Sequence, residues 1–142
     1  MSLELVHFAT MTVDLSPDVL VIPSGPLGTR VVAEVDKVVV TGDKLNATMA
    51  GKSAADWLTI GPDGTYGTLD VRLTLKTDDD ALIYVEYSGR IDLATNRVVS
   101  APLFQTGDER YDWLNRIQAV ADGTNNTETH ELVYELYEAR SA

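Results

Sequence analysis

The chain of 142 residues contains no cysteine. This absence excludes a disulfide framework, a zinc site built from thiolates, and a cysteine nucleophile, and it fits a reducing compartment. A chain of this length buries about two-thirds of the surface that it exposes when unfolded, so its core needs neither a disulfide nor a metal. Since no linker or repeat interrupts the sequence, we expect one domain over residues 1–142.

Basic residues are scarce, with 11 Lys and Arg against 22 Asp and Glu, for a net charge of −11. Nucleic acids and anionic membranes attract clustered Lys and Arg, so we expect neither as a partner. No apolar run approaches the roughly 20 residues that span a membrane. The segment Met1–Leu5 has no basic region followed by an apolar run, unlike a signal peptide. The expected location is cytoplasmic.

Familiar binding motifs are absent as well. The two histidines, His7 and His130, match no metal-binding spacing. The sequence also lacks a phosphate loop, a dinucleotide fingerprint and a nucleophile elbow. We therefore expect no metal and no cofactor.

Alternation with a period of two residues dominates the sequence. Leu69, Val71, Leu73 and Leu75 alternate with polar residues, which predicts a strand with two unlike faces. A turn-rich Thr-Asp-Asp-Asp segment separates this strand from a second candidate at 81–91, so the two should form a hairpin. Further candidate strands are 5–13, 30–40, 45–50, 57–60, 116–121 and 128–139, and the one short helix is expected at 108–114.

Polar turn signals at 23–26, 41–43, 61–64 and 122–125 separate these runs. Evenly spaced short strands of this kind predict an all-β antiparallel meander that closes into a barrel. About eight to ten strands fit the length, and a barrel of about eight strands is either filled by side chains or holds one small ligand.

Three groups of residues are candidates for chemistry. Asp70 and Arg72 share one face of their strand, which is either a solvated stripe or an inward-facing, hydrogen-bonded pair. Asp56 is either a turn residue followed by a core aromatic, Trp57, or an acid or base beside a pocket wall. The segment 104–115 is rich in aromatic and ionisable residues, and it either plugs one end of the barrel or forms a pocket rim.

Several ordered segments together resemble the family called domain of unknown function 3237. They are Gly25-Pro26-Leu27-Gly28-Thr29-Arg30, Ala55-Asp56-Trp57-Leu58, residues 69–79, Gly89-Arg90, residues 104–115 and residues 132–138. The sequence departs from the family pattern at Asp80, where glycine is usual, and this difference should affect only a hairpin turn.

The resemblance implies a compact, lipocalin-like β-barrel with no assigned general activity. It also implies that the even-numbered face of strand 69–76 looks into the barrel. On this basis Asp56, Asp70 and Arg72 are the candidate catalytic residues. The candidate ligand-binding residues are Arg30, Trp57, Tyr84, Glu109, Arg110, Tyr111, Trp113 and Asn115.

Two functions fit these candidates. The first is a cofactor-independent isomerase, cyclase or lyase, in which a carboxylate is the general base and an arginine or tyrosine stabilises an oxyanion. The second is a non-catalytic carrier in which aromatic residues enclose a small organic ligand that Arg72 anchors. A purely structural oligomer subunit is a third possibility, and a homodimer is compatible with all three. Barrels host both catalysis and carriage, so the fold cannot decide between them.

Overall fold

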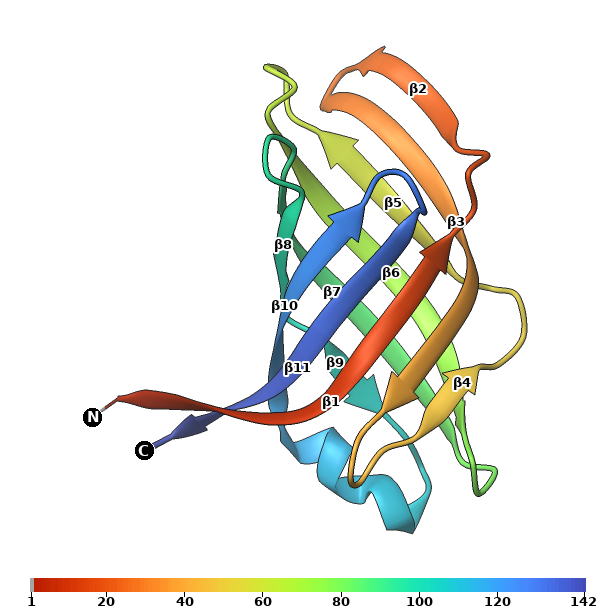
Figure 1. Ribbon diagram of the computed structural model, residues 1–142, viewed down its shortest axis with the longest axis vertical. Coiled ribbons are helices and arrows are strands. Elements are labelled where there is room, and N and C mark those ends of the chain that lie inside the picture. Colours follow the sequence, from red (N-terminus) through yellow and green to blue (C-terminus); the bar gives the residue numbers. More distant parts are fainter. Residues whose placement is uncertain (1) are drawn as a thin grey trace.

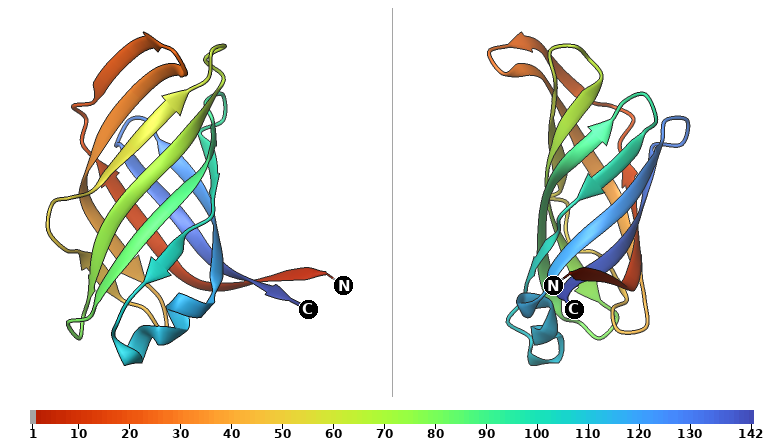
Figure 2. Two further views of the ribbon diagram at one scale, coloured as in Figure 1. Left: turned by 180° about the vertical axis from the view of Figure 1, so that it is seen from behind. Right: turned by 90° about the vertical axis from the view of Figure 1, so that its left-hand side faces the viewer.

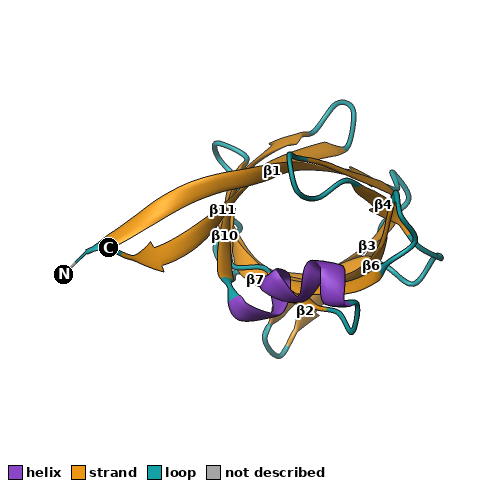
Figure 3. Cartoon of the chain, turned by 90° about the horizontal axis from the view of Figure 1, so that it is seen from below, coloured by secondary structure: helices purple, strands orange, loops and turns teal. Residues whose placement is uncertain are grey.

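The computed structural model describes residues 2–142, which form one antiparallel sheet rolled into a barrel (Figures 1 and 3). The predicted all-β class is confirmed. The described residues contain eleven strands: β1 (Leu3–Leu15), β2 (Leu20–Gly25), β3 (Gly28–Thr41), β4 (Ala47–Met49), β5 (Ala55–Ile60), β6 (Tyr66–Thr77), β7 (Leu82–Asp92), β8 (Arg97–Ser100), β9 (Leu103–Gln105), β10 (Gln118–Asn126) and β11 (Glu131–Ser141).

The barrel wall has eight strand positions, because two pairs of short strands each share one position. β4 and β5 both lie between β3 and β6, and β8 and β9 both pair with β7. The ring closes through the β6–β7 and β1–β11 pairs, while β2 pairs with β3 outside the ring. A closed ring leaves few free strand edges.

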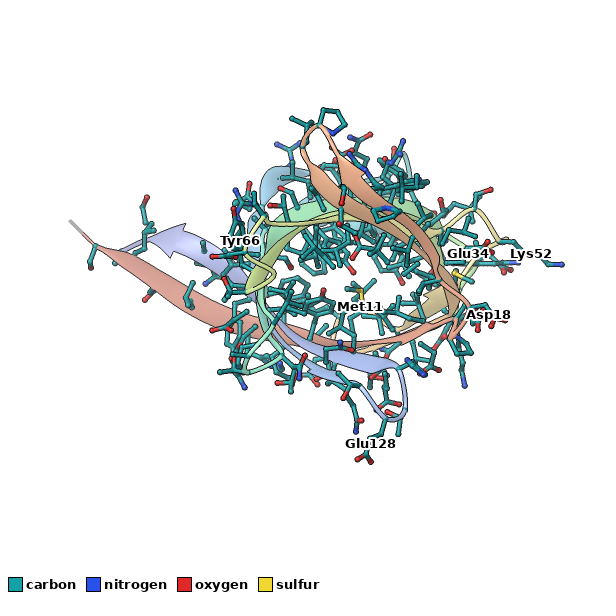
Figure 4. All side chains as sticks on the ribbon, turned by 90° about the horizontal axis from the view of Figure 1, so that it is seen from above. Met11, Asp18, Glu34, Lys52, Tyr66 and Glu128 are labelled. Carbon is teal, nitrogen blue, oxygen red and sulfur yellow. The ribbon has the colours of Figure 1, made fainter. Side chains whose placement is uncertain are left out.

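Alternation along the strands fills the interior. In β6 the residues Leu69, Val71, Leu73 and Leu75 are buried, and in β7 the inward residues include Ile83 and Val85. The core continues across β1, β3, β10 and β11, and nearly all of it belongs to a single cluster. Seen from above, the side chain of Met11 lies inside the ring, whereas Asp18, Glu34 and Glu128 point away from it (Figure 4).

A 3-10 helix, η1 (Glu109–Arg116), lies at the lower end of the barrel (Figures 1 and 3). Asp108 caps it, because its carboxylate accepts a hydrogen bond from the backbone N–H of Arg110. Tyr111 and Leu114 point into the core and are buried. The helix expected at 108–114 is thus present, with Asp108 as its cap one residue before the helix begins.

The strand pattern differs from the prediction in three respects, one being that β8 and β9 were not among the predicted strands. Residues 122–125 do not form a turn but lie within β10, where all four pair with β11 and residues 122–124 also pair with β8. The strand β2 was not predicted, because its Pro-Ser-Gly sequence indicated a turn; the chain in fact stays extended as far as Gly25. Together with β3 it forms a hairpin that extends beyond the upper rim (Figures 1 and 2).

None of the described residues forms a helix that is both long and apolar enough to cross a membrane.

Candidate functional site

A cavity of about 190 Å³ opens at the upper end of the barrel, away from η1. Its walls are mostly apolar and come from strands all around the ring. Four polar residues also line it, namely Ser16, Asp56, Asn125 and His130. The apolar lining residues are Leu15, Val19, Val31, Ala33, Leu58, Leu69, Ile91, Val98 and Leu132. No lysine or arginine is among the residues that line it.

Asp56 is the buried carboxylate of this cavity, with 9% of its surface exposed. It faces inward because it lies opposite the buried Ala33 in β3, and its neighbours on the same face are Leu58 and Ile60. Asp56, Val71 and Tyr87 lie side by side across β5, β6 and β7.

The β5–β6 ladder is interrupted directly after Asp56. Backbone pairing stops at Asp56–Val71 and resumes at Thr59–Thr68. In the gap, the N–H of Asp70 donates to Oδ1 of Asp56 at 3.1 Å, and the carbonyl of Trp57 accepts from Nη1 of Arg30 at 3.1 Å. Backbone groups left free by the gap are thus satisfied by side chains, and the Asp56 carboxylate is held in place.

Burial raises the pKa of Asp56 from 3.8 to about 7. Removal from water disfavours the charged carboxylate, and the hydrogen bond from Asp70 only partly offsets this effect, while the nearby Asp70 charge adds to it. Near neutral pH both the acid and the carboxylate forms of Asp56 are therefore populated. A group with this property can both accept and donate a proton, as general acid–base catalysis requires.

Two tyrosines lie deeper in the barrel, below the cavity lining. Tyr87 and Tyr134 are almost fully buried, and their rings meet edge to face at 5.5 Å. Burial raises the pKa of both phenols, and the charge of Asp56 raises it further. Within residues 2–142, Ser100 Oγ and Asn125 Oδ1 are buried without a hydrogen-bond partner. A buried polar atom without a hydrogen bond lowers the stability of the fold, so these atoms are available to bond a molecule that enters the interior.

Gly123 makes room for Tyr134. A Cβ at position 123 would lie 2.6 Å from Cδ1 of the ring, so Gly123→Ala forces the ring to move. We expect a loss of about 1–3 kcal/mol in the free energy of unfolding, measured by urea denaturation, because the core is closely packed. Gly107→Ala is the matched control: a Cβ there has no neighbour within 4 Å, and the change should stay within about 0.5 kcal/mol. Equal losses in both variants would contradict this account of the packing.

The expectation that the even-numbered face of β6 looks inward is wrong. Asp70 and Arg72 are exposed, and the odd-numbered face is buried, because turning it outward would expose four large apolar side chains. Arg72 instead lies over the ring of Trp57 on the outer wall, 4.3 Å from its centroid. Tyr84, also on the outside, donates a hydrogen bond to Glu86.

The segment 104–115 closes the lower end of the barrel, so it is the plug and not the rim of this cavity. Tyr111 donates a hydrogen bond to Asp79, and Arg110 forms ion pairs with Asp79 and Asp108. Asn115 forms two hydrogen bonds with the backbone of Thr106: its Oδ1 accepts from the N–H, and its Nδ2 donates to the carbonyl. Glu109 is exposed, and Trp113 packs edge-on against Phe8.

Of the eleven predicted site residues, Asp56 alone lines the upper cavity. Arg30, Trp57 and Arg72 lie behind it on the outer wall, and the residues of η1 lie at the other end. Sequence reasoning did not select Asn125, Tyr87 or Tyr134. Alternation in β11 would have placed Tyr134 on the same face as the buried Leu132 and Leu136.

A second hollow, of about 280 Å³, lies where the β1–β11 ribbon leaves the barrel, and it includes Trp113 and Lys44. The ionisable side chains that line it, among them His7, Glu138 and Arg140, are all at least partly exposed, so none of them is buried. Across residues 2–142, no three metal-ligating side chains lie close enough together to hold a metal ion. The upper cavity is therefore the candidate site.

Fold and site together define a small closed β-barrel with a buried carboxyl group at an apolar cavity. The chain belongs to the family described as protein of unknown function (DUF3237), whose model matches residues 3–139.

The chain is also similar to a named enzyme by sequence and to two solved structures by fold. A hydroalkoxylation enzyme, phnH, from Penicillium herquei is 32% identical over 96 residues, which are 68% of this chain and 58% of that enzyme. A β-barrel-like protein from Acinetobacter baumannii has a TM-score of 0.85 at 23% identity, covering 99% of this chain and 98% of that one. The structure of an enzyme from Penicillium herquei has a TM-score of 0.69 at 23% identity, covering 98% and 94%. The two structures show a shared fold.

Proposed function

We propose that this protein is an enzyme in which the Asp56 carboxyl group performs proton transfer on a small, uncharged organic molecule. The observation that carries the proposal is a carboxyl group of pKa about 7 at the wall of an apolar cavity. An ionisable group with a shifted pKa in a cleft is the usual sign of acid–base catalysis. The lining contains no Lys or Arg, so an anionic substrate would meet no permanent positive charge there.

The reaction that fits best is the addition of a hydroxyl group across a carbon–carbon double bond, or its reverse. The Asp56 carboxylate takes the hydroxyl proton as the oxygen–carbon bond forms. The electron pair of the double bond then receives a proton from the resulting carboxylic acid at the other carbon. The carboxylate is regenerated, and substrate and product are isomers when both groups belong to one molecule. The name of the Penicillium relative supports this choice.

Incubation with alkenes that carry a hydroxyl group, in water and in D₂O, tests the proposal. In water the product should have the same mass as the substrate but a different chromatographic retention. In D₂O it should gain one deuterium at carbon, because the Asp56 proton exchanges with solvent. Ligand binding with no conversion across such a panel would contradict catalysis and support the carrier function.

A further inference from the structure

The β2 segment carries an apolar surface that the barrel leaves uncovered. Val19, Leu20, Val21 and Ile22 are consecutive, and they are 45%, 63%, 54% and 57% exposed. Since neighbouring residues of a strand point to opposite faces, both faces of β2 are apolar and open to solvent. We call these four residues the β2 patch. A run of four exposed apolar residues is abnormal on a free protein surface unless it has a function.

The edge of β2 is open as well. Among the described strands it pairs with β3 only, through Leu20–Val32, Val21–Val31 and Ile22–Arg30. Its outer edge therefore presents backbone N–H and C=O groups that another strand can bind. An occupant that satisfies both the edge and the two apolar faces must itself offer an extended apolar strand.

We propose that the β2 patch binds the β2 patch of a second copy of this chain, as an antiparallel strand pair centred on Val21. Antiparallel pairing of a strand with itself obeys a two-fold axis, so the contact is closed and forms a dimer. The Pro23 ring removes one N–H donor, which limits pairing to the residues before it.

Charge favours a second copy as the occupant. The chain has a net charge of −11, so two copies repel each other over most of their surfaces. Residues 19–29 contain no charged side chain, which makes the hairpin the surface where two copies can meet without repulsion. A basic partner would prefer the acidic faces elsewhere.

The dimer would also affect the candidate site. Val19 belongs both to the β2 patch and to the cavity lining. The two-fold contact therefore lies beside the mouth of the cavity, where a partner restricts solvent access. The dimer itself does not depend on the proposed enzymatic function.

Gel filtration with light scattering tests the proposal. The patch is smaller than a standard interface, so we expect a dissociation constant on the order of 10 µM and a dimer at about 100 µM. Leu20→Glu should weaken association at least about 100-fold, because each dimer contains the substitution twice. Val99→Glu is the matched control, since Val99 is 63% exposed on β8, and it should leave the dimer intact.

A crosslink tests the register, and the absence of cysteine from the chain makes it specific. Pairing centred on Val21 brings the two Cα atoms to about 4.5–5.5 Å, within disulfide range. Val21→Cys should therefore form a covalent dimer under mild oxidation, and Val99→Cys should not. A wild-type monomer at about 100 µM, a dimer that survives Leu20→Glu, or no Val21→Cys crosslink would each overturn the proposal. So would a monomer that sediments with phosphatidylcholine vesicles through this patch, since it would assign the patch to a lipid surface.

Discussion

Asp56→Asn is expected to reduce turnover of a hydroxyl-bearing alkene substrate by about 100- to 10,000-fold, the range that general acid–base catalysis contributes. Asparagine keeps the shape of the side chain and the oxygen that accepts the Asp70 N–H, but it cannot act as a general acid or base. Ligand affinity should fall far less than the rate. Steady-state kinetics of the wild type and the variant, with binding measured by calorimetry, separate the two quantities.

Asp36→Asn provides the control for this experiment. Asp36 is exposed on β3, and the substitution removes the same charge from the chain without touching the cavity. Its turnover should match that of the wild type. If Asp56→Asn retained full activity, the proton transfer assigned to Asp56 would be wrong, whatever the affinity for ligand.

The second large effect concerns stability. The pKa of Asp56 is 3.8 as an ordinary carboxyl group and about 7 in the folded protein. A raised pKa means that the folded state binds the proton more tightly than the unfolded state does. The stabilisation that this proton provides is fully present below pH 3.8, and it is lost as the pH rises through about 7. At about 1.4 kcal/mol per pKa unit, the loss amounts to about 4 kcal/mol at pH 8.

Asp56→Asn lacks this loss because its side chain stays neutral. The variant should therefore gain stability relative to the wild type as the pH rises from 4 to 8, by about 4 kcal/mol in the free energy of unfolding. Urea denaturation of both proteins at several pH values measures the difference. Contributions from other groups, such as Asp79, whose pKa the hydrogen bond from Thr77 lowers, cancel in the comparison. A difference that stays constant with pH would show that Asp56 titrates normally.

How far the sequence predicts this molecule depends on which force decides each feature. The alternation of Leu69, Val71, Leu73 and Leu75 placed the buried face of β6 correctly by itself, because hydrophobic burial sets strand orientation. The family resemblance implied that Asp70 and Arg72 face inward, against this pattern, and both residues in fact face outward. The pattern in β11 likewise contained enough information to bury Tyr134.

Other features depend on contacts between distant segments. Asp56 is unusual because its carboxyl group is buried at the cavity wall and is held by the Asp70 N–H where the β5–β6 ladder opens. No local pattern in residues 55–60 signals that gap. The strand at 122–125 has the composition of a turn, yet it is extended because β8 and β11 pair with it on both sides. Backbone pairing with two neighbouring strands overrides local propensity here.

Where the β5–β6 ladder opens, the backbone N–H of Asp70 can report the charge of the Asp56 side chain. The Asp70 N–H bonds a titrating carboxylate where a strand would normally supply a carbonyl. Its proton resonance should therefore shift as Asp56 ionises, and shift again when a ligand displaces or protonates that carboxylate. A single backbone amide, observed by NMR without any added probe, thus follows the charge state of the cavity and identifies the compounds that enter it.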